Sequence, residues 1–318
     1  MPDPFVPTAS PAADAPRPSG ASGPSGASSA SRLCAEGIAL TYDRTEVISD
    51  LTVRIPDGGF TVIIGPNACG KSTLLRGLSR LLAPARGQVV LDGRSISRYP
   101  AKEVARRLGL LPQSAIAPEG ITVADLVARG RYPYQRLVRQ WSAQDERAVA
   151  RALEDTATTE LAERQVDELS GGQRQRVWVA MVLAQETDLV LLDEPTTYLD
   201  VAHQIELMEL FSDLHAAGRT VVAVLHDLNH AARYATHVIA MREGRILAEG
   251  PPREVITSAR VEAVFGLPNV VIADPVTGGP LVVPRGGRAP STRVADPTPA
   301  ASGAIQAASG PSAAREGR

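Results

Sequence analysis

The sequence predicts an α/β fold with a mixed, largely parallel sheet, an N-terminal antiparallel β-subdomain and an inserted α-helical subdomain. Three short, almost continuous apolar runs, each followed by helical periodicity, indicate parallel strands covered on both faces; they are residues 60–64, 189–192 and 220–225. Two segments around a polar turn, residues 37–42 and 47–55, are typical of antiparallel strands. We therefore expect an antiparallel β-region to open the domain and a buried sheet to form its centre.

Helical patterns account for the segments between these strands. The first buried strand is followed by a glycine-containing loop and by a helix expected at residues 71–82. An inserted helical subdomain is expected at about residues 114–186, because no buried-strand run follows Pro112 in this stretch. Its helices are predicted at residues 123–129, 142–156 and 173–185. Ser142 followed by Asp145 resembles a helix N-cap with an acidic third position, where Asp is second best.

Composition separates one ordered body from two terminal segments. Residues 1–32 are built almost wholly from Pro, Ala, Ser, Gly and Asp, and residues 286–318 repeat that bias. Such segments bury too little apolar surface to offset the entropy of ordering, so both are predicted to be disordered. The body, residues 33–285, is long and apolar enough to bury a core, because 44% of the chain is hydrophobic. Two hairpins are expected near its end, at residues 237–248 and 270–283.

Charge and composition exclude several functional classes. The formal net charge is −2 and the arginines are scattered, so no nucleic-acid partner is expected. No run approaches the ~20 apolar residues that cross a bilayer, and no signal-peptide pattern begins the chain, which favours the cytoplasm. Cys34 and Cys69 form no CxxC pair, which argues against a disulfide framework or a zinc site. Only Lys71 and Lys102 are lysines, so a position that keeps lysine is expected to need it.

A glycine-rich loop follows the first buried strand and has the spacing of a phosphate-binding loop. Its residues are Gly65, Pro66, Asn67, Ala68, Cys69, Gly70, Lys71 and Ser72, with Thr73 next in the helix. Glycines let backbone N–H groups converge on phosphates, Lys71 reaches the β- and γ-phosphates, and Ser72 can ligate Mg²⁺. The sequence therefore predicts a site for ATP and Mg²⁺. The alternative is a glycine-rich turn with an exposed lysine. Cys69 occupies a free position, where a packed or exposed thiol is the simpler interpretation than a redox-active one.

Two carboxylates end the second buried strand. Asp193 and Glu194 follow four apolar residues, which places them at the carboxyl edge where ligands of parallel sheets collect. Asp193 suits Mg²⁺, through its water shell, and Glu194 suits a general base. A helix cap is the alternative for such a pair on its own, but the phosphate loop favours the functional interpretation.

A third motif opens the helix that leads into this strand. Leu169 is followed by Ser170, Gly171, Gly172 and Gln173, which resemble the signature motif of the ABC ATPases. Ser170 and the two glycines would offer a hydroxyl and bare amides at a positive helix end, which suits a γ-phosphate. An ordinary N-cap is the alternative.

The resemblance to ABC ATPases spans residues 33 to about 284 and implies their P-loop NTPase core. In the family order, Tyr42 resembles the aromatic residue that stacks on adenine, and Gln113 the glutamine that senses Mg²⁺ and the membrane partner. Asp200 resembles the aspartate between subunits, and His226 the switch histidine. Taken singly, Tyr42 could be a strand aromatic, Asp200 a helix cap, and Gln113 or His226 polar loop residues.

Four segments carry a narrower resemblance, to the ATPases of bacterial iron–siderophore importers, whose relatives carry haem or vitamin B12. These segments are residues 129–135, 183–186, 225–229 and 274–284. A proline-containing surface loop is the alternative for the first of them. Tyr198 departs from the pattern, because tryptophan is expected there in the most similar members; this leaves the chemistry untouched and weakens the substrate assignment.

The family resemblance implies a head-to-tail pair of chains that share each ATP. Lys71, Ser72 and Mg²⁺ would hold the phosphates from one subunit, while Ser170 and Gly172 close over the γ-phosphate from the other. Glu194 would orient water, and His226 would support the developing charge. Closure would drive a membrane permease, served by an extracellular substrate-binding protein, from the cytoplasmic face, with docking between Gln113 and Gln135.

Other functional classes remain open at this point. An exporter subunit is the nearest competitor. A stand-alone ABC ATPase acting on nucleic acid or ribosomes would usually show two cassettes or long insertions, which this sequence lacks. A structural P-loop scaffold would be expected to lack Glu194 or His226.

Overall fold

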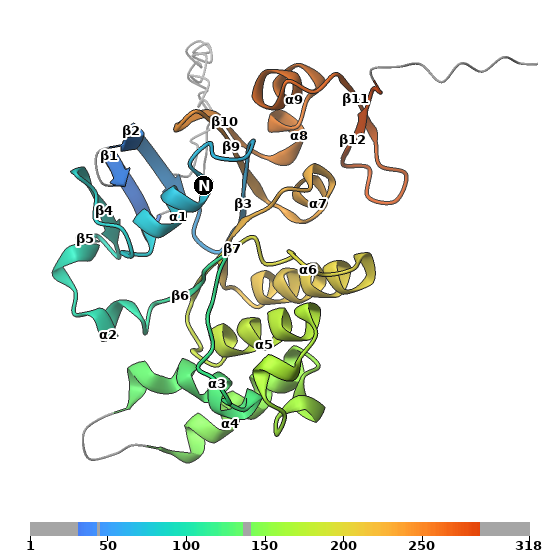
Figure 1. The fold of residues 1–318 in the computed structure, drawn as a ribbon. Helices are drawn as coiled ribbons and strands as arrows, with labels where there is room; N and C mark the ends of the chain where they lie inside the picture. Colours follow the sequence, from blue (N-terminus) through green and yellow to red (C-terminus); the bar gives the residue numbers. More distant parts are fainter. Residues whose placement is uncertain (1–30, 43–44, 136–140, 287–318) are drawn as a thin grey trace, which may run out of the picture.

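The computed structural model describes residues 31–42, 45–135 and 141–286, and a six-stranded sheet forms its centre (Figure 1). The strands of this sheet are β3 (Phe60–Ile64), β6 (Leu108–Leu111), β7 (Leu189–Asp193), β8 (Thr220–Val224), β9 (His237–Arg242) and β10 (Arg245–Gly250). Their order is β10-β9-β3-β8-β7-β6, with β10 antiparallel to β9 and all other neighbours parallel. The expected mixed, largely parallel sheet is confirmed. The terminal segments predicted to be disordered lie outside the described residues, except at Ser31, Arg32 and Gly286.

A second, antiparallel sheet of four strands forms the N-terminal part of the fold. Its strands are β1 (Leu33–Tyr42), β2 (Thr45–Ile55), β4 (Arg86–Leu91) and β5 (Arg94–Ser95), in the order β2-β1-β4-β5. The two strands expected at residues 37–42 and 47–55 are confirmed as the ends of longer strands. Strand β4 was not predicted, because three exposed residues precede the buried Val89 and Leu91 and leave almost no alternation of polar and apolar residues.

Helices cover the sheets and form a compact group at the foot of Figure 1. The α-helices are α1 (Lys71–Leu78), α2 (Ala101–Val104), α3 (Val123–Ala128), α4 (Ala143–Asp155), α5 (Gly171–Leu183), α6 (Val201–Ala216), α7 (Leu228–Tyr234), α8 (Pro252–Val255) and α9 (Ser258–Phe265). The 3₁₀ helices are η1 (Ile96–Arg98), η2 (Arg129–Tyr134), η3 (Thr159–Leu161) and η4 (Val166–Glu168). Helices α3, α4 and α5 pack against one another within the stretch expected to be helical.

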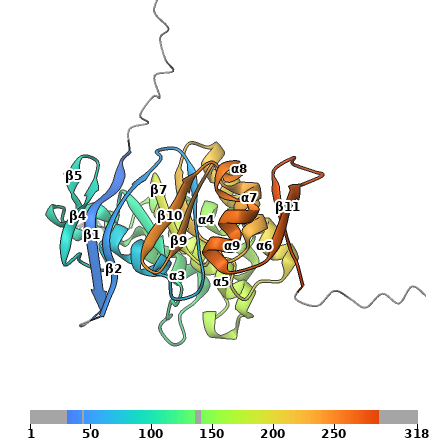
Figure 2. The same ribbon diagram turned by 90° about the horizontal axis from the view of Figure 1, so that it is seen from above.

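The two faces of the six-stranded sheet are buried against different layers. On β7, Leu189 and Leu191 join a core that includes α1 and the antiparallel sheet, whereas Val190 and Leu192 join a core with α3 to α9. Both faces of the sheet are therefore shielded from solvent, and for this reason the sequence of β7 is a continuous apolar run. Seen from above, the antiparallel sheet lies at one end of the molecule and β11 (Asn269–Ala273) at the other (Figure 2).

Helix α1 ends four residues earlier than predicted, and the backbone shows why. Arg80 has a φ of 66°, the left-handed conformation that commonly terminates helices. The N–H groups of Leu81 and Leu82 both donate to the carbonyl oxygen of Arg76, at 2.9 and 3.0 Å. By contrast, the predicted start of α4 is confirmed, because Ser142 and Asp145 form a reciprocal capping box.

A buried arginine holds the helical region together. Arg131 is 1% exposed; its Nε donates to Asp145 at 2.8 Å, and its Nη1 donates to Glu186 at 2.9 Å and to the carbonyl of Ala184 at 2.8 Å. Burial raises the pKa of the Asp145 carboxyl, but hydrogen bonds from Ser142 and Arg131 outweigh it and bring the pKa below its ordinary value. The stabilisation is therefore complete above the ordinary aspartate pKa of about 3.9 and is lost as pH falls through the lowered value.

Replacing Arg131 by leucine is expected to destabilise the protein by about 3–5 kcal/mol, because it leaves the buried Asp145 carboxylate unpaired. Denaturant unfolding of the full chain measures the change. Arg151→Leu is the matched control: Arg151 lies 3.8 Å from the same Glu186 but is 66% exposed, so its loss should cost less than about 1 kcal/mol. Equal, small losses for both variants would contradict a structural role for Arg131.

A two-stranded hairpin completes the described chain. It consists of β11 and β12 (Pro280–Pro284), and together with the hairpin of β9 and β10 it confirms the two predicted near the end of the body. Among the helices of residues 31–42, 45–135 and 141–286, none is long and apolar enough to cross a lipid bilayer.

Candidate functional site

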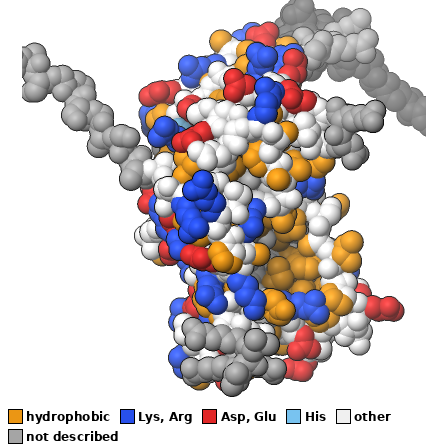
Figure 3. All heavy atoms as spheres, turned by 90° about the vertical axis from the view of Figure 1, so that its left-hand side faces the viewer, with side chains coloured by type: hydrophobic (Ala, Val, Ile, Leu, Met, Phe, Trp, Pro, Cys, Tyr) orange, Lys and Arg blue, Asp and Glu red, His pale blue; other side chains and the backbone are white. Residues whose placement is uncertain are grey.

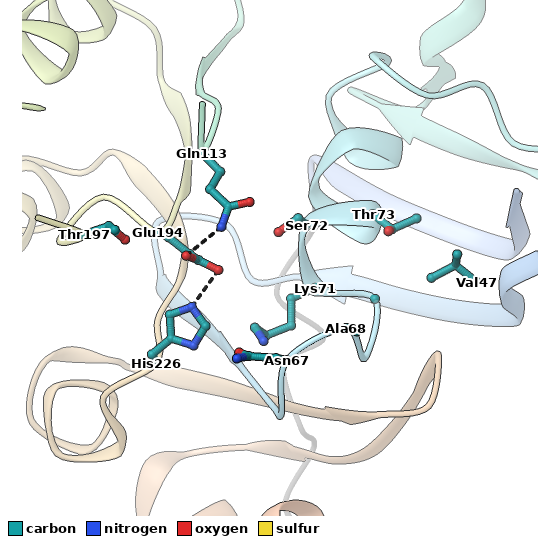
Figure 4. A pocket seen from close by; sticks show the side chains of 11 residues that line it. Val47, Asn67, Ala68, Lys71, Ser72, Thr73, Gln113, Glu194, Thr197 and His226 are labelled. Atoms are coloured by element: carbon teal, nitrogen blue, oxygen red, sulfur yellow. Dashed lines mark hydrogen bonds and ion pairs between the residues drawn. The ribbon is translucent and has the colours of Figure 1, made fainter. Parts of the chain in front are cut away.

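A cavity of about 680 Å³ opens where the carboxyl ends of β3, β6, β7 and β8 meet. This edge is where parallel α/β sheets bind their ligands. The side chains drawn in Figure 4 come from β2, from the loop after β3, from α1 and from the turns that follow β6, β7 and β8. The lining residues are Val47, Asn67, Ala68, Gly70, Lys71, Ser72, Thr73, Gln113, Glu194, Thr197 and His226.

The phosphate-binding loop needs glycine at two points. A Cβ added at Gly65 would lie 2.3 Å from the carbonyl oxygen of Met241, so no side chain fits there. Gly70, the N-cap of α1, has a φ of 104°, which L-residues with side chains rarely adopt. Between them, Cys69 is buried, and burial raises the pKa of its thiol, which stays protonated at neutral pH. A protonated, packed thiol agrees with the non-redox interpretation of this position.

The Lys71 side chain is buried within the phosphate-binding loop. It is 5% exposed, and its Nζ donates to the carbonyl oxygens of Gly65 and Pro66, both at 2.9 Å. The ammonium charge is thus held at the mouth of the loop beside the N-terminus of α1. Both features give the cavity positive potential where an anionic ligand would enter.

Ser72 and Asp193 form a hydroxyl–carboxylate pair at the floor of the site. Ser72 Oγ donates to Asp193 Oδ1 at 2.8 Å, and Asp193 is 2% exposed. Burial raises the pKa of the Asp193 carboxyl, and the hydrogen bond from Ser72 only partly opposes this. A divalent cation would stabilise the ionised carboxylate, and oxygen donors of this kind are the ligands that Mg²⁺ prefers. The donor set therefore fits Mg²⁺.

Glu194 is held by the two other residues predicted to be catalytic (Figure 4). Its Oε2 accepts from Nε2 of Gln113 at 2.8 Å, and its Oε1 lies 2.6 Å from Nε2 of His226. The backbone of Glu194 has a φ of 54°, a conformation that costs energy for a non-glycine residue and that clusters at functional sites. Two residues far from it in sequence, Gln113 and His226, thus converge on the Glu194 carboxylate.

The remaining predicted residues lie elsewhere. Ser170 caps α5 in a capping box with Gln173, and Asp200 caps α6 by accepting from the N–H of His203 at 3.0 Å. Gly171 and Gly172 pack beside Tyr198 and Leu199, which brings the signature motif next to the turn that holds Asp200. Tyr42 lies at the end of β1, where its hydroxyl accepts from Arg76 at 3.1 Å. The members of this second group, which do not line the cavity, are Tyr42, Ser170, Gly171, Gly172, Gln173 and Asp200.

Two residues of the cavity wall, Val47 and Thr197, were not predicted from the sequence. Val47, from β2, adds an apolar side chain beside Gly70, and a valine in a strand carries no chemical signal of such a role. Thr197 lies in the turn three residues after Glu194. This closeness in sequence to a predicted catalytic residue could have indicated that Thr197 lines the cavity.

A second, more open cavity lies over the region where docking was predicted. It has a volume of about 690 Å³ and is lined by Asp125, Ala128, Arg129, Tyr132 and Gln135. We call it the η2 groove, because Arg129 and Tyr132 belong to η2. Tyr132 is 64% exposed, although its neighbour Arg131 is buried. Figure 3 shows the face of the molecule on the α2 side, where hydrophobic side chains gather around a hollow.

Comparisons with known proteins agree with this geometry. The family model for ABC transporters matches residues 48–197. FepC of Escherichia coli (strain K12), a ferric enterobactin transport ATP-binding protein, is 59% identical over 265 residues, which cover 83% of this chain and 98% of FepC. A solved transporter described as of the metal-chelate ABC type, in an inward-facing conformation, aligns with a TM-score of 0.68 at 29% identity, over 80% of this chain and 97% of that one.

The dimeric structure of MJ0796, a bacterial ABC transporter cassette, aligns with a TM-score of 0.63 at 26% identity, over 70% of this chain and 99% of that one. The expected ABC ATPase fold is therefore confirmed. The chain belongs to the ABC transporter family and is one of its ATP-hydrolysing subunits.

Proposed function

We propose that this chain drives the import of a ferric siderophore through a membrane permease, working from the cytoplasmic face. The observation that carries the proposal is the Glu194 carboxylate, which Gln113 and His226 hold at the edge of the cavity that the phosphate loop lines. The siderophore assignment is supported by the identity to FepC and by the Arg131 contacts, which join two of the four segments of the narrower resemblance.

ATP would bind with its β- and γ-phosphates on the amides of the loop and on Lys71. The anionic phosphates would compete for the ammonium group with the two carbonyls that it now contacts. Ser72 and Asp193 would hold Mg²⁺, which supplies neutralisation of the phosphate charge when bound. Tyr42 would stack on adenine beyond the apolar wall that Val47 provides.

Glu194 would act as the general base. Its carboxylate would accept a proton from the attacking water, while Gln113 and His226 keep it pointed at the γ-phosphate. The contacts with Gln113 and His226 favour a single orientation of the side chain, which is the preorganisation that such chemistry needs.

A second copy of the chain would complete each site. Ser170, Gly171 and Gly172 present a helix N-terminus that does not face this chain's own cavity, and Asp200 lies in the turn that packs beside them. A head-to-tail pair would bring this surface of one copy over the γ-phosphate held by the other. The dimeric structure of the similar cassette MJ0796 supports the pairing of two copies.

The permease would dock in the η2 groove. Tyr132 is the exposed aromatic side chain of that groove, and aromatic residues are enriched in protein interfaces. The buried Arg131 next to it fixes the backbone that presents Tyr132. A substrate-binding protein would contact the permease and not this chain. The net charge of −2 gives no reason to expect a nucleic-acid partner.

Cells lacking this chain are expected to lose uptake of at least one radiolabelled ferric siderophore, because both ATPase subunits of the proposed pair would be copies of it. A plasmid copy of the unmutated chain should restore uptake, and a Glu194→Gln copy should not. Normal siderophore uptake together with lost haem or vitamin B12 uptake would contradict the siderophore assignment. Copurification with a permease but with no substrate-binding protein would favour an exporter.

A further inference from the structure

Two segments of the narrower resemblance lie in direct contact. Asn229 of α7 belongs to the first, residues 225–229, and Val282 of β12 belongs to the second, residues 274–284. We propose that Asn229 is a positioning residue, which ties the β11–β12 hairpin to α7 and thereby holds His226 beside Glu194. The inference rests on the proposed function, which assigns His226 to the site.

The contact is a two-way hydrogen bond between a side chain and a backbone. Asn229 Oδ1 accepts from the N–H of Val282 at 2.8 Å, and Asn229 Nδ2 donates to the carbonyl of Val282 at 3.3 Å. A carboxamide carries the same donor and acceptor as a peptide group, so Asn229 pairs with β12 as a neighbouring strand would. An apolar side chain of the same size would lose both bonds.

The hairpin is a firm support for this contact. Val282 is 4% exposed and belongs to the larger core. At the tip, Asp274 accepts from the N–H of Val276 and, through its carbonyl, from that of Gly278, both at 2.8 Å. At the base, the Asn269 side chain donates to the carbonyl of Ser258 in α9 at 3.1 Å. The hairpin is thus held at its tip, middle and base.

The first turn of α7 transmits this support to His226. Asp227 caps the helix by accepting from the N–H groups of Asn229 at 2.7 Å and of His230 at 3.0 Å, so these residues form one hydrogen-bonded unit. His226 directly precedes the unit. Its side chain is 47% exposed, so little packing holds the ring, and its 2.6 Å approach to Glu194 depends on where the backbone is placed.

The family model does not account for this arrangement. It matches residues 48–197, whereas α7 and the hairpin both lie beyond them. Asn229 itself does not line the ATP cavity, so its effect on hydrolysis has to act through another residue.

Asn229→Leu is expected to lower kcat about tenfold and to change KM for ATP less than about twofold, because the loss is one of positioning rather than of nucleotide contact. Tyr234→Phe is the matched control. Tyr234 lies at the other end of α7 and donates to Glu209 at 2.8 Å, so the variant also loses a hydrogen bond of this helix, but not at the His226 end. Its kcat should stay unchanged. Asn229→Asp keeps the acceptor and loses the donor, and should fall between the unmutated protein and Asn229→Leu.

A double-mutant cycle separates positioning from general destabilisation. In a His226→Gln background, Asn229→Leu should lower the remaining rate less than about twofold, because the residue through which it acts is already gone. The imidazole NMR signals of His226, identified by their loss in His226→Gln, should shift in Asn229→Leu and stay in place in Tyr234→Phe.

An equal loss of kcat in both backgrounds, or an unmoved His226 signal, would overturn the inference. A His226→Gln protein that hydrolyses ATP at the normal rate would instead contradict the role given to His226 in the proposed function. If Asn229→Leu does not fold, Asn229→Asp carries the same kinetic and NMR comparison.

Discussion

A Glu194→Gln variant is expected to hydrolyse ATP roughly 10²–10⁴-fold more slowly while still binding it, and to form a stable ATP-bound dimer. Glutamine keeps the size of the side chain but cannot take a proton from water. One of its two terminal atoms becomes a donor, so either Gln113 must turn its amide or His226 must accept. The change also removes a negative charge beside the γ-phosphate, which favours closure of the dimer electrostatically.

Size-exclusion chromatography with light scattering tests the dimer directly. The variant should be a monomer without nucleotide and a dimer with ATP, and adding Ser170→Arg should prevent dimerisation by blocking the partner's γ-phosphate cradle. Glu160→Gln, at an exposed position of η3, controls for the loss of one carboxylate. A Glu194→Gln protein that binds ATP, stays monomeric even beside its permease and turns over at the normal rate would contradict the shared-site mechanism.

Lys71→Ala is expected to abolish ATP turnover, because the loop loses the cation that faces the β- and γ-phosphates. The variant also frees the carbonyls of Gly65 and Pro66, which the ammonium group now holds at 2.9 Å. The phosphate-binding loop should therefore lose both its positive charge and the two hydrogen bonds that fix its conformation.

ATP hydrolysis by the purified chain, with and without its permease, is the measurement for Lys71→Ala. Lys102→Ala removes the only other lysine and should leave hydrolysis by the isolated chain intact. Turnover by Lys71→Ala within about a factor of two of the unmutated protein would remove Lys71 from the site.

The sequence predicted those parts of the fold whose signals are local. Residues 60–64 were predicted as a strand and form β3 without error, because an apolar run there ends sharply at Gly65. The phosphate loop and Glu194 could be placed at one sheet edge because parallel strands bring their carboxyl ends together. The end of α1 could not be predicted, since it depends on Arg80 adopting a left-handed conformation that arginine does not signal.

Features that depend on contacts between residues far apart in the sequence could not be predicted. A proline-containing surface loop was the alternative for residues 129–135, yet Arg131 is among the most buried side chains. Its burial could not be predicted, because its partners Asp145 and Glu186 lie 14 and 55 residues away in the sequence. Asn229 stood in a recognised segment, but its partner Val282 is 53 residues further along. No periodicity within either segment encodes such contacts.

The scarcity of lysine makes side-chain amine chemistry on this protein selective. Lys71 is buried, with its Nζ bonded to two carbonyls, whereas Lys102 on α2 donates to the carbonyl of Gln135 and lies 5.0 Å from the ring of Tyr132. Among the side chains, Lys102 should therefore react first with an amine-reactive dye. Because Tyr132 and Gln135 line the η2 groove, the fluorescence of that dye would report directly on what enters the groove, while the nucleotide site keeps its native lysine.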